Sequence, residues 1–130
     1  MHPELLRLQE AAQGLLYLSE TDAPLLAFEL DGTGVAPEAA LPALSDAPAG
    51  TPPERVELTH FFRNQVRAEE GGGPELSHRA GRFRSLQQQL EKTLAGVAVY
   101  RLGSVQVDAF ILGRLPDGTV GGLRTKLVET

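Results

Sequence analysis

Residues 97–130 decide the fold, and they read VAVYRLGSVQVDAFILGRLPDGTVGGLRTKLVET. Val, Ile, Leu, Phe and Tyr are frequent in this segment, and these residue types favour β-strands. Gly and Pro interrupt the apolar pattern at two places, where they permit the chain to turn. The segment therefore predicts three strands joined by two tight turns.

The second turn, LPDGT at residues 115–119, determines how its two strands pair. A type I turn followed by a glycine in the left-handed conformation closes a three-residue hairpin loop, which sets Leu115 opposite Thr119. A shift of one residue would exchange the two faces of the strand, placing apolar side chains on the polar face. The predicted pairs are Ile111 with Leu123, Val107 with Leu127, and Asp108 with Lys126.

The same type of loop, placed at residues 101–103, predicts the pairing of the first two strands. It sets Val99 opposite Val105 and Val97 opposite Val107. The core face of the sheet is then expected to carry Val97, Val99, Val105, Val107, Ala109, Ile111, Leu123 and Leu127. At the end of the third strand, Glu129 falls opposite Val105, and Thr130 is expected beside the turn at residues 103–104.

The N-terminal part predicts a helix followed by two apolar segments. Pro3 suits the first position of a helix, and apolar residues recur at spacings of three and four over residues 3–14. An apolar segment at 15–18 leads into a short polar loop at 19–22, which carries two carboxylates. Residues 25–30 predict a strand that an Asp-Gly pair ends.

The middle of the chain predicts a surface connection and two further helices. Residues 33–53 hold five of the nine prolines and predict an irregular segment with one helical turn around 38–41. Residues 56–58 predict a short strand, and Thr59 is expected to cap a short helix. A long helix is expected from Pro74. Its predicted buried stripe is Leu76, Ala80, Phe83, Leu86, Leu90 and Leu94. Its predicted solvated face carries Arg79, Arg82, Arg84, Gln88 and Lys92.

Length and composition indicate one domain that spans residues 1–130. The chain has no cysteine, which excludes disulfides, thiol catalysis and cysteine-based zinc sites. The first residues lack the basic start and long apolar run of a signal peptide, so we expect a soluble, cytoplasmic protein. The net charge of −5 divides into −8 over residues 1–60 and +3 over residues 61–130. An acidic chain repels phosphates, which argues against direct binding to nucleic acid.

No catalytic or metal-binding motif is visible. The three histidines, His2, His60 and His78, do not have the spacing of metal ligands. Two pairs of carboxylates, Glu20 with Asp22 and one pair at residues 29 and 31, have the chemistry of a general acid and base. Such pairs are commonly just solvated, so we expect a protein that is not an enzyme. A small hydrolase that uses Glu20 and Asp22 is the weaker alternative.

Six short blocks in chain order carry a resemblance to a known family. They are GLLYLSETDAP at 14–24, VELTHFF at 56–62, VYRLG at 99–103, VD at 107–108, GGL at 121–123 and TKLVET at 125–130. Together these blocks resemble the nuclease A inhibitor-like family. The resemblance implies an α+β fold, an α-β-α sandwich around a mainly antiparallel sheet with helices packed on its faces.

The resemblance also implies a function. It implies an inhibitor that occupies the active site of a sugar-non-specific, divalent-metal nuclease in a 1:1 complex. Glu20 and Thr130 match the contact residues of the family, with Ser19, Asp22 and Glu129 beside them. An oxygen of Thr130, from its hydroxyl or carboxylate, would meet the Mg²⁺ or Mn²⁺ of the partner, and the inhibitor would need no cofactor of its own. The alternative is an adaptor domain that keeps the fold and does not inhibit.

Overall fold

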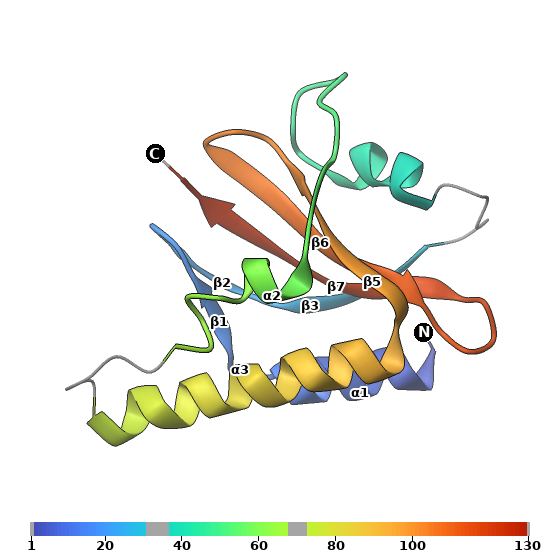
Figure 1. Ribbon diagram of the computed structural model, residues 1–130. Coiled ribbons are helices and arrows are strands. Elements are labelled where there is room, and N and C mark those ends of the chain that lie inside the picture. The colour runs from blue at the N-terminus through green and yellow to red at the C-terminus, as the bar shows by residue number, and fades with distance from the viewer. Residues whose placement is uncertain (1, 31–36, 68–72, 130) are drawn as a thin grey trace.

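A computed structural model describes residues 2–30, 37–67 and 73–129, and in this part of the chain a five-stranded antiparallel sheet is the central layer (Figure 1). Its strands, in spatial order, are β3 (Leu26–Leu30), β7 (Val120–Val128), β6 (Gln106–Arg114), β5 (Ala95–Leu102) and β4 (Glu54–Val56). A separate two-stranded sheet pairs β1 (Leu16–Leu18) with β2 (Asp22–Pro24). The helices are α1 (Pro3–Ala12), the 3₁₀-helix η1 (Pro37–Leu44), α2 (Leu58–Phe61) and α3 (Gly73–Thr93).

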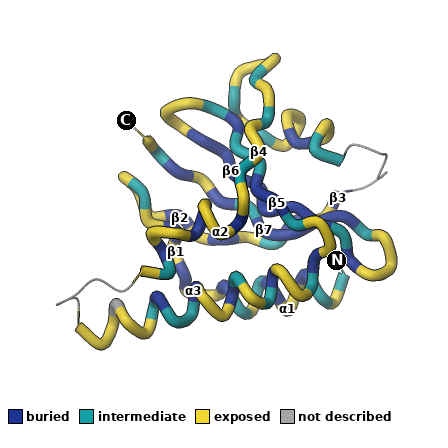
Figure 2. The backbone as a smooth tube through the Cα atoms, in the orientation of Figure 1, coloured by how far each residue is buried: buried dark blue, intermediate teal, exposed yellow. Residues whose placement is uncertain are grey.

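Both faces of the sheet are covered by helices. In Figure 1, α1 and α3 run side by side beneath the sheet, and η1 lies on the opposite side. The larger core cluster lies on the side of the sheet that α1 and α3 cover, and α1, α2 and α3 all contribute buried side chains to it. On the opposite face Leu41 of η1 is completely buried in a second cluster with Phe28, Leu102 and Phe110. Burial is concentrated in the sheet and on the inward sides of the helices (Figure 2). The α+β sandwich predicted from the sequence is confirmed.

The hairpin of β6 and β7 has the predicted register. The Leu115 amide donates to the carbonyl of Thr119 at 2.8 Å, and Gly118 has a φ of 91°, a conformation that favours glycine. Ile111 pairs with Leu123, Val107 with Leu127, and Asp108 with Lys126. The loop type alone was sufficient to predict this register, because both strands continue directly from the loop.

The turn between β5 and β6 differs from the prediction. Val99 pairs with Ile111 instead of Val105, and Leu102 pairs with Asp108, so residues 101 and 102 extend the strand rather than form the loop. Leu102 is completely buried, and its burial favours the strand over an exposed turn position. The shift is an even number of residues, so most of the predicted core face is preserved. The exception is Val105, which lies in the turn and is 50% exposed.

Several boundaries also differ from the predictions. The short strand β4 ends at Val56, whereas Leu58 belongs to α2 and is buried in the core. The N-cap residue of α2 is Glu57, so the prediction that Thr59 caps this helix is wrong. The helical turn expected at 38–41 is longer than predicted, because it extends as η1 from Pro37 to Leu44 and includes Pro42. The strand predicted at 25–30 is confirmed as β3.

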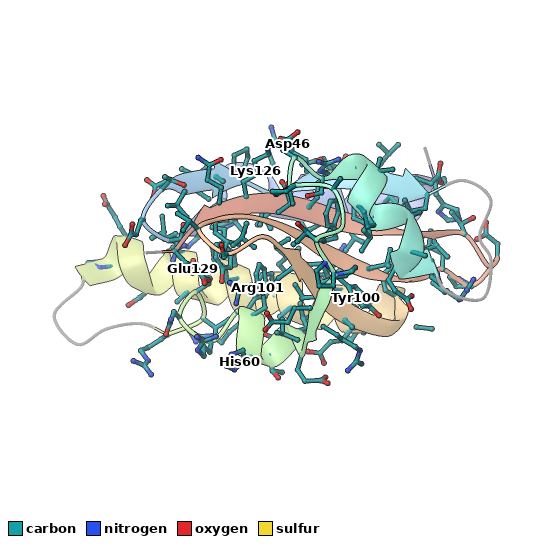
Figure 3. The ribbon with its side chains drawn as sticks, turned by 90° about the horizontal axis from the view of Figure 1, so that it is seen from above. Asp46, His60, Tyr100, Arg101, Lys126 and Glu129 are labelled. Carbon is teal, nitrogen blue, oxygen red and sulfur yellow. The ribbon has the colours of Figure 1, made fainter. Side chains whose placement is uncertain are left out.

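The segment after η1 is attached to the sheet by a buried carboxylate. Asp108 is 6% exposed and accepts two hydrogen bonds of 2.8 Å, from the Ser45 hydroxyl and from the backbone amide of Asp46. Lys126, the cross-strand neighbour of Asp108, forms an ion pair with Asp46 (Figure 3). The hydrogen bond from Lys126 lowers the pKa of Asp46 and raises the pKa of Lys126. This arrangement holds η1 against its face of the sheet.

Candidate functional site

The turn between β1 and β2 lies against the end of β7. The Val128 amide donates to the hydroxyl oxygen of Ser19 at 3.1 Å, and the Glu20 amide donates to the Val128 carbonyl at 3.3 Å. Within the turn, the Ser19 amide donates to the carbonyl of Thr21 at 3.0 Å. Two segments that are about a hundred residues apart in sequence are therefore joined by one backbone hydrogen bond and one to the Ser19 hydroxyl, with the exposed Glu20 at their junction.

Glu129 continues β7 next to the turn between β5 and β6. Its backbone amide donates to the Val105 carbonyl at 2.8 Å, which confirms that Glu129 lies opposite Val105. Its carboxylate forms an ion pair with the Arg101 guanidinium at 2.5 Å. Arg101 is mostly buried, with 21% of its side chain exposed, so it fixes the direction of the Glu129 side chain. Thr130, the next predicted site residue, lies outside the described residues.

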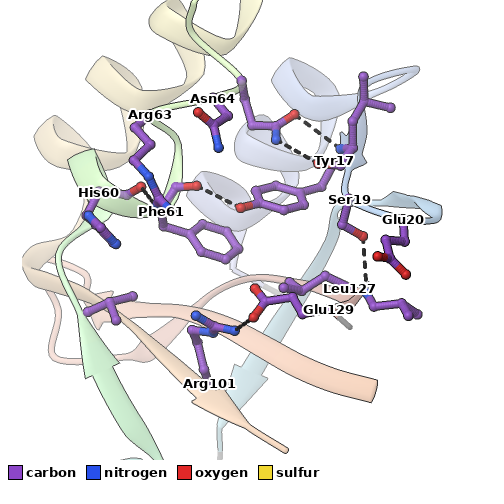
Figure 4. A pocket seen from close by; sticks show the side chains of 14 residues that line it. Tyr17, Ser19, Glu20, His60, Phe61, Arg63, Asn64, Arg101, Leu127 and Glu129 are labelled. Atoms are coloured by element: carbon purple, nitrogen blue, oxygen red, sulfur yellow. Dashed lines mark hydrogen bonds and ion pairs between the residues drawn. The ribbon is translucent and has the colours of Figure 1, made fainter. Parts of the chain in front are cut away.

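A pocket of about 320 Å³ opens beside this junction (Figure 4). Its walls come from β1 and the following turn, from α2 and the residues after it, and from the ends of β5 and β7. The lining includes Tyr17, Leu18, Ser19, Glu20, Val56, His60, Phe61, Arg63, Asn64, Gln65, Arg101, Leu127, Val128 and Glu129. Three of the predicted site residues, Ser19, Glu20 and Glu129, are thus brought together at one pocket.

Asp22 has a different position. It is the first residue of β2, pairs with Leu18, and is exposed, but it is not among the residues that line the pocket. The pairing of Glu20 with Asp22 at one reaction centre, which the hydrolase alternative requires, therefore gains no support from the pocket. The other pair considered, at residues 29 and 31, includes one residue outside the described part; Glu29 accepts a hydrogen bond from the backbone amide of His2 at 3.3 Å.

Two stacked aromatic rings line the pocket. The rings of Tyr17 and Phe61 stack with their centroids 4.5 Å apart, and the Tyr17 hydroxyl donates to the Phe61 carbonyl at 2.8 Å. Burial raises the pKa of Tyr17 above its ordinary value of 10.0, because the charged phenolate is poorly solvated there. These contacts join α2 to β1 beside the pocket.

Gln65 completes the support of β1, a role that no motif or spacing in the sequence indicates. Its side-chain amide donates to the Leu18 carbonyl at 2.9 Å and accepts from the Leu18 amide at 3.1 Å, as a neighbouring strand would. Gln65 is 2% exposed, and Arg79 of α3 donates both to its side-chain oxygen at 2.5 Å and to the Leu16 carbonyl at 2.8 Å. The prediction of a solvated Arg79 is therefore wrong, because its guanidinium connects α3 to β1.

Arg82 of α3, which was also expected on a solvated face, has a similar role. Its guanidinium donates to the carbonyls of Ala11 at 3.2 Å and Gln13 at 2.7 Å, just where α1 ends. Carbonyls at the end of a helix have no partner within the helix, and a cationic donor satisfies them. Together Arg79 and Arg82 join α3 to the N-terminal segment that leads into the Ser19–Thr21 turn.

The charges around the pocket are separated. Glu20 and Glu129 belong to the walls made by the turn and by β7, whereas His60 and Arg63 belong to the wall made by α2 and the residues after it (Figure 4). The described residues contain no group of three or more His, Asp or Glu side chains that could hold a metal ion. The arrangement can present carboxylates to a cation of a partner at one side and a guanidinium at the other.

Among the described residues, none of the helices has the length and apolar character that a membrane span requires.

Comparison with known proteins identifies the family. Residues 3–130 match the family model described as "NuiA: Nuclease A inhibitor-like protein", which covers nearly the whole chain. No curated protein sequence matches the chain. The family description supplies the general function, inhibition of a nuclease, and the match extends over every segment that forms the pocket. The chain therefore belongs to the nuclease A inhibitor-like family.

Proposed function

We propose that this protein inhibits a sugar-non-specific nuclease that depends on a divalent metal, by occupying the nuclease active site as one copy per nuclease. The observation that carries the proposal is the junction of the Ser19–Thr21 turn with Val128. Two hydrogen bonds, from the Val128 amide to the Ser19 hydroxyl and from the Glu20 amide to the Val128 carbonyl, hold the exposed Glu20 directly beside the end of β7. An exposed carboxylate at such an edge fits an active site that normally receives a phosphate.

The chemistry of the edge suits a hard metal ion. Mg²⁺ and Mn²⁺ prefer oxygen ligands, and a nuclease metal keeps water sites open for its substrate. We propose that the Glu20 carboxylate takes one of these sites in place of a substrate phosphate, and that an oxygen of Thr130 supplies a second contact. In this proposal the inhibitor brings no cofactor of its own, since the metal belongs to the nuclease.

The neighbouring residues have supporting roles in this proposal. Ser19 orients the turn, because its hydroxyl accepts from the backbone of β7 at 3.1 Å. Glu129 forms an ion pair with Arg101, and this contact orients the end of β7 beside Glu20. Asp22, which is exposed on β2 outside the pocket, extends the acidic surface that faces the partner.

A charge-removing substitution at Glu20 tests the proposal. Glu20→Gln keeps the shape of the side chain and removes its charge, and it should weaken inhibition of a purified nuclease A-type enzyme by about 2 kcal/mol or more, roughly 30-fold in Ki. The free energy of unfolding should change by less than about 0.5 kcal/mol, because Glu20 is exposed. Ki from a nuclease assay and thermal melting measure the two effects.

Glu10→Gln is the matched control, since Glu10 is an exposed carboxylate on α1 that does not line the pocket. It should inhibit like the unchanged chain. Equal inhibition by Glu20→Gln would remove Glu20 from the proposed contact. Parallel losses of stability and inhibition would make Glu20 a structural residue.

A further inference from the structure

The pocket beside Glu20 has a basic wall that the proposed contact with the metal does not use. His60, Arg63 and Asn64 are exposed and line the pocket on the side of α2 and the residues that follow it. Figure 4 places them on one side of the stacked Tyr17 and Phe61 rings, with Arg101 and Glu129 on the other. This wall faces the same opening as Glu20.

The charges of the opposite wall already neutralise one another. Arg101 and Glu129 form an ion pair at 2.5 Å, which leaves little net charge at that side. Arg63 has a different situation, because its guanidinium donates at 2.6 Å to an uncharged acceptor, the backbone carbonyl of His60. No carboxylate of the described residues lies within ion-pair distance of Arg63. A guanidinium has five N–H donors in a planar fork, so most of the donors of Arg63 remain for a partner.

We infer that this pocket receives an Asp or Glu side chain of the partner nuclease, with Arg63 as its cationic contact and the Asn64 amide as a further donor. The inference rests on the proposed function, because a nuclease bound at Glu20 lies over the mouth of the pocket. A carboxylate matches the guanidinium fork in shape and charge and can form two parallel hydrogen bonds with it. Carboxylates are available in such a partner, since proteins hold divalent metals with Asp and Glu.

A charge reversal with a matched control tests the inference. Arg63→Glu would place a carboxylate against the incoming one and should raise the Kd for a purified nuclease A-type enzyme by roughly 100-fold. Arg63→Lys keeps the charge and loses the fork, so its Kd should rise by less than about tenfold. Arg84→Glu makes the same change of charge at an exposed site on α3 outside the pocket and should leave the Kd unchanged.

Rescue identifies the bound group. Acidic residues that border the nuclease active site are changed to Lys one at a time, and one of these variants should recover at least about tenfold of the affinity that Arg63→Glu loses. Thermal melting of each inhibitor variant verifies that it is folded. If Arg63→Glu binds as tightly as Arg84→Glu, the inference is wrong; a loss that no nuclease variant restores also contradicts a bound carboxylate.

The two proposals fail in distinguishable ways. Loss of inhibition by Glu20→Gln without any effect of Arg63→Glu would contradict the pocket contact alone. An unchanged chain that binds no nuclease A-type enzyme would overturn the proposed function and the pocket contact together.

Discussion

At the scale of the residue, Tyr17 joins two parts of the site through one hydroxyl. Its hydroxyl donates to the Phe61 carbonyl. Burial favours the neutral phenol over the charged phenolate and raises the pKa of Tyr17 above 10.0. The folded chain therefore keeps the proton at a pH where the unfolded chain loses it. The contribution of this group to stability is complete below pH 10.0 and decreases as the pH rises through the pKa of the folded state.

Tyr17→Phe should consequently have two effects. At neutral pH the loss of one buried hydrogen bond should lower the free energy of unfolding by about 1 kcal/mol. Above pH 10, the decline of stability with pH should be shallower in the variant than in the unchanged chain, because the group that titrates has been removed. Urea unfolding at several pH values measures both. An alkaline decline of equal slope in the two proteins would contradict the assignment.

Predictions about single residues were right where the nearby sequence determines the position of the side chain. They were wrong where a contact with a residue far along the chain determines it. Pro3 begins α1 as its fixed φ predicts, and the stripe from Ala80 to Leu94 is buried as its spacing predicts. Arg79 was predicted to be solvated because it lies on the face of the helix opposite the apolar stripe. Its actual partners, Gln65 and the Leu16 carbonyl, are brought to it only by the fold. No pattern within α3 contains that information.

At the scale of the element, the hairpin of β6 and β7 provides the central strands of the core. Leu127 is 3% exposed on this hairpin, whereas Val105, in the preceding turn, is 50% exposed. Leu127→Ala should lower the free energy of unfolding by about 2–5 kcal/mol, through lost burial and the cavity that remains. Val105→Ala, the control, should change it by less than about 1 kcal/mol. Denaturant unfolding distinguishes these outcomes, and similar costs for both would contradict the observed assignment of faces.

The two turns of this region explain why only one register could be predicted. LPDGT has a defined loop type, so its chemistry sets the pairing without reference to the rest of the chain. RLGS has one glycine and no such definition. Gly103 directly follows the last residue of β5, so it begins the turn, whereas the prediction made it the last loop residue. Its φ of 112° favours glycine, and a Cβ there would lie 2.2 Å from the Gln106 carbonyl oxygen. Burial of Leu102 then determines the length of β5.

At the scale of the whole molecule, the candidate site is assembled from segments far apart in sequence. The Ser19–Thr21 turn, the residues after α2, and the end of β7 each contribute one wall of the pocket. Residue patterns could place Glu129 opposite Val105, but they could not bring Glu20 to the same edge. That expectation came from the family resemblance, and the hydrogen bonds between the turn and Val128 provide its physical basis. No sequence pattern marked Arg63 as a site residue, and only its position at the pocket identifies it.

An assembled acidic edge that contacts a metal predicts a coupling between Glu20 and that metal. Removal of Mg²⁺ from a nuclease A-type enzyme with EDTA should weaken binding of the unchanged inhibitor, because the carboxylate loses its partner and faces the acidic ligands of the empty site. Glu20→Gln has already lost this contact and should depend less on the metal. The four Kd values form a thermodynamic cycle, with an expected coupling of about 1–3 kcal/mol.

Glu10→Gln should respond to EDTA like the unchanged chain, since its charge lies on α1 outside the pocket. Calorimetry or surface binding, rather than catalytic assay, is the suitable measurement, because the nuclease is inactive without its metal. A residual dependence on Mg²⁺ in Glu20→Gln is expected if Thr130 supplies the second oxygen, and it should disappear in a variant that also lacks Thr130. If the unchanged chain and Glu20→Gln lost the same factor of affinity on chelation, the carboxylate would not contact the metal, and its role would be limited to the charge of the edge.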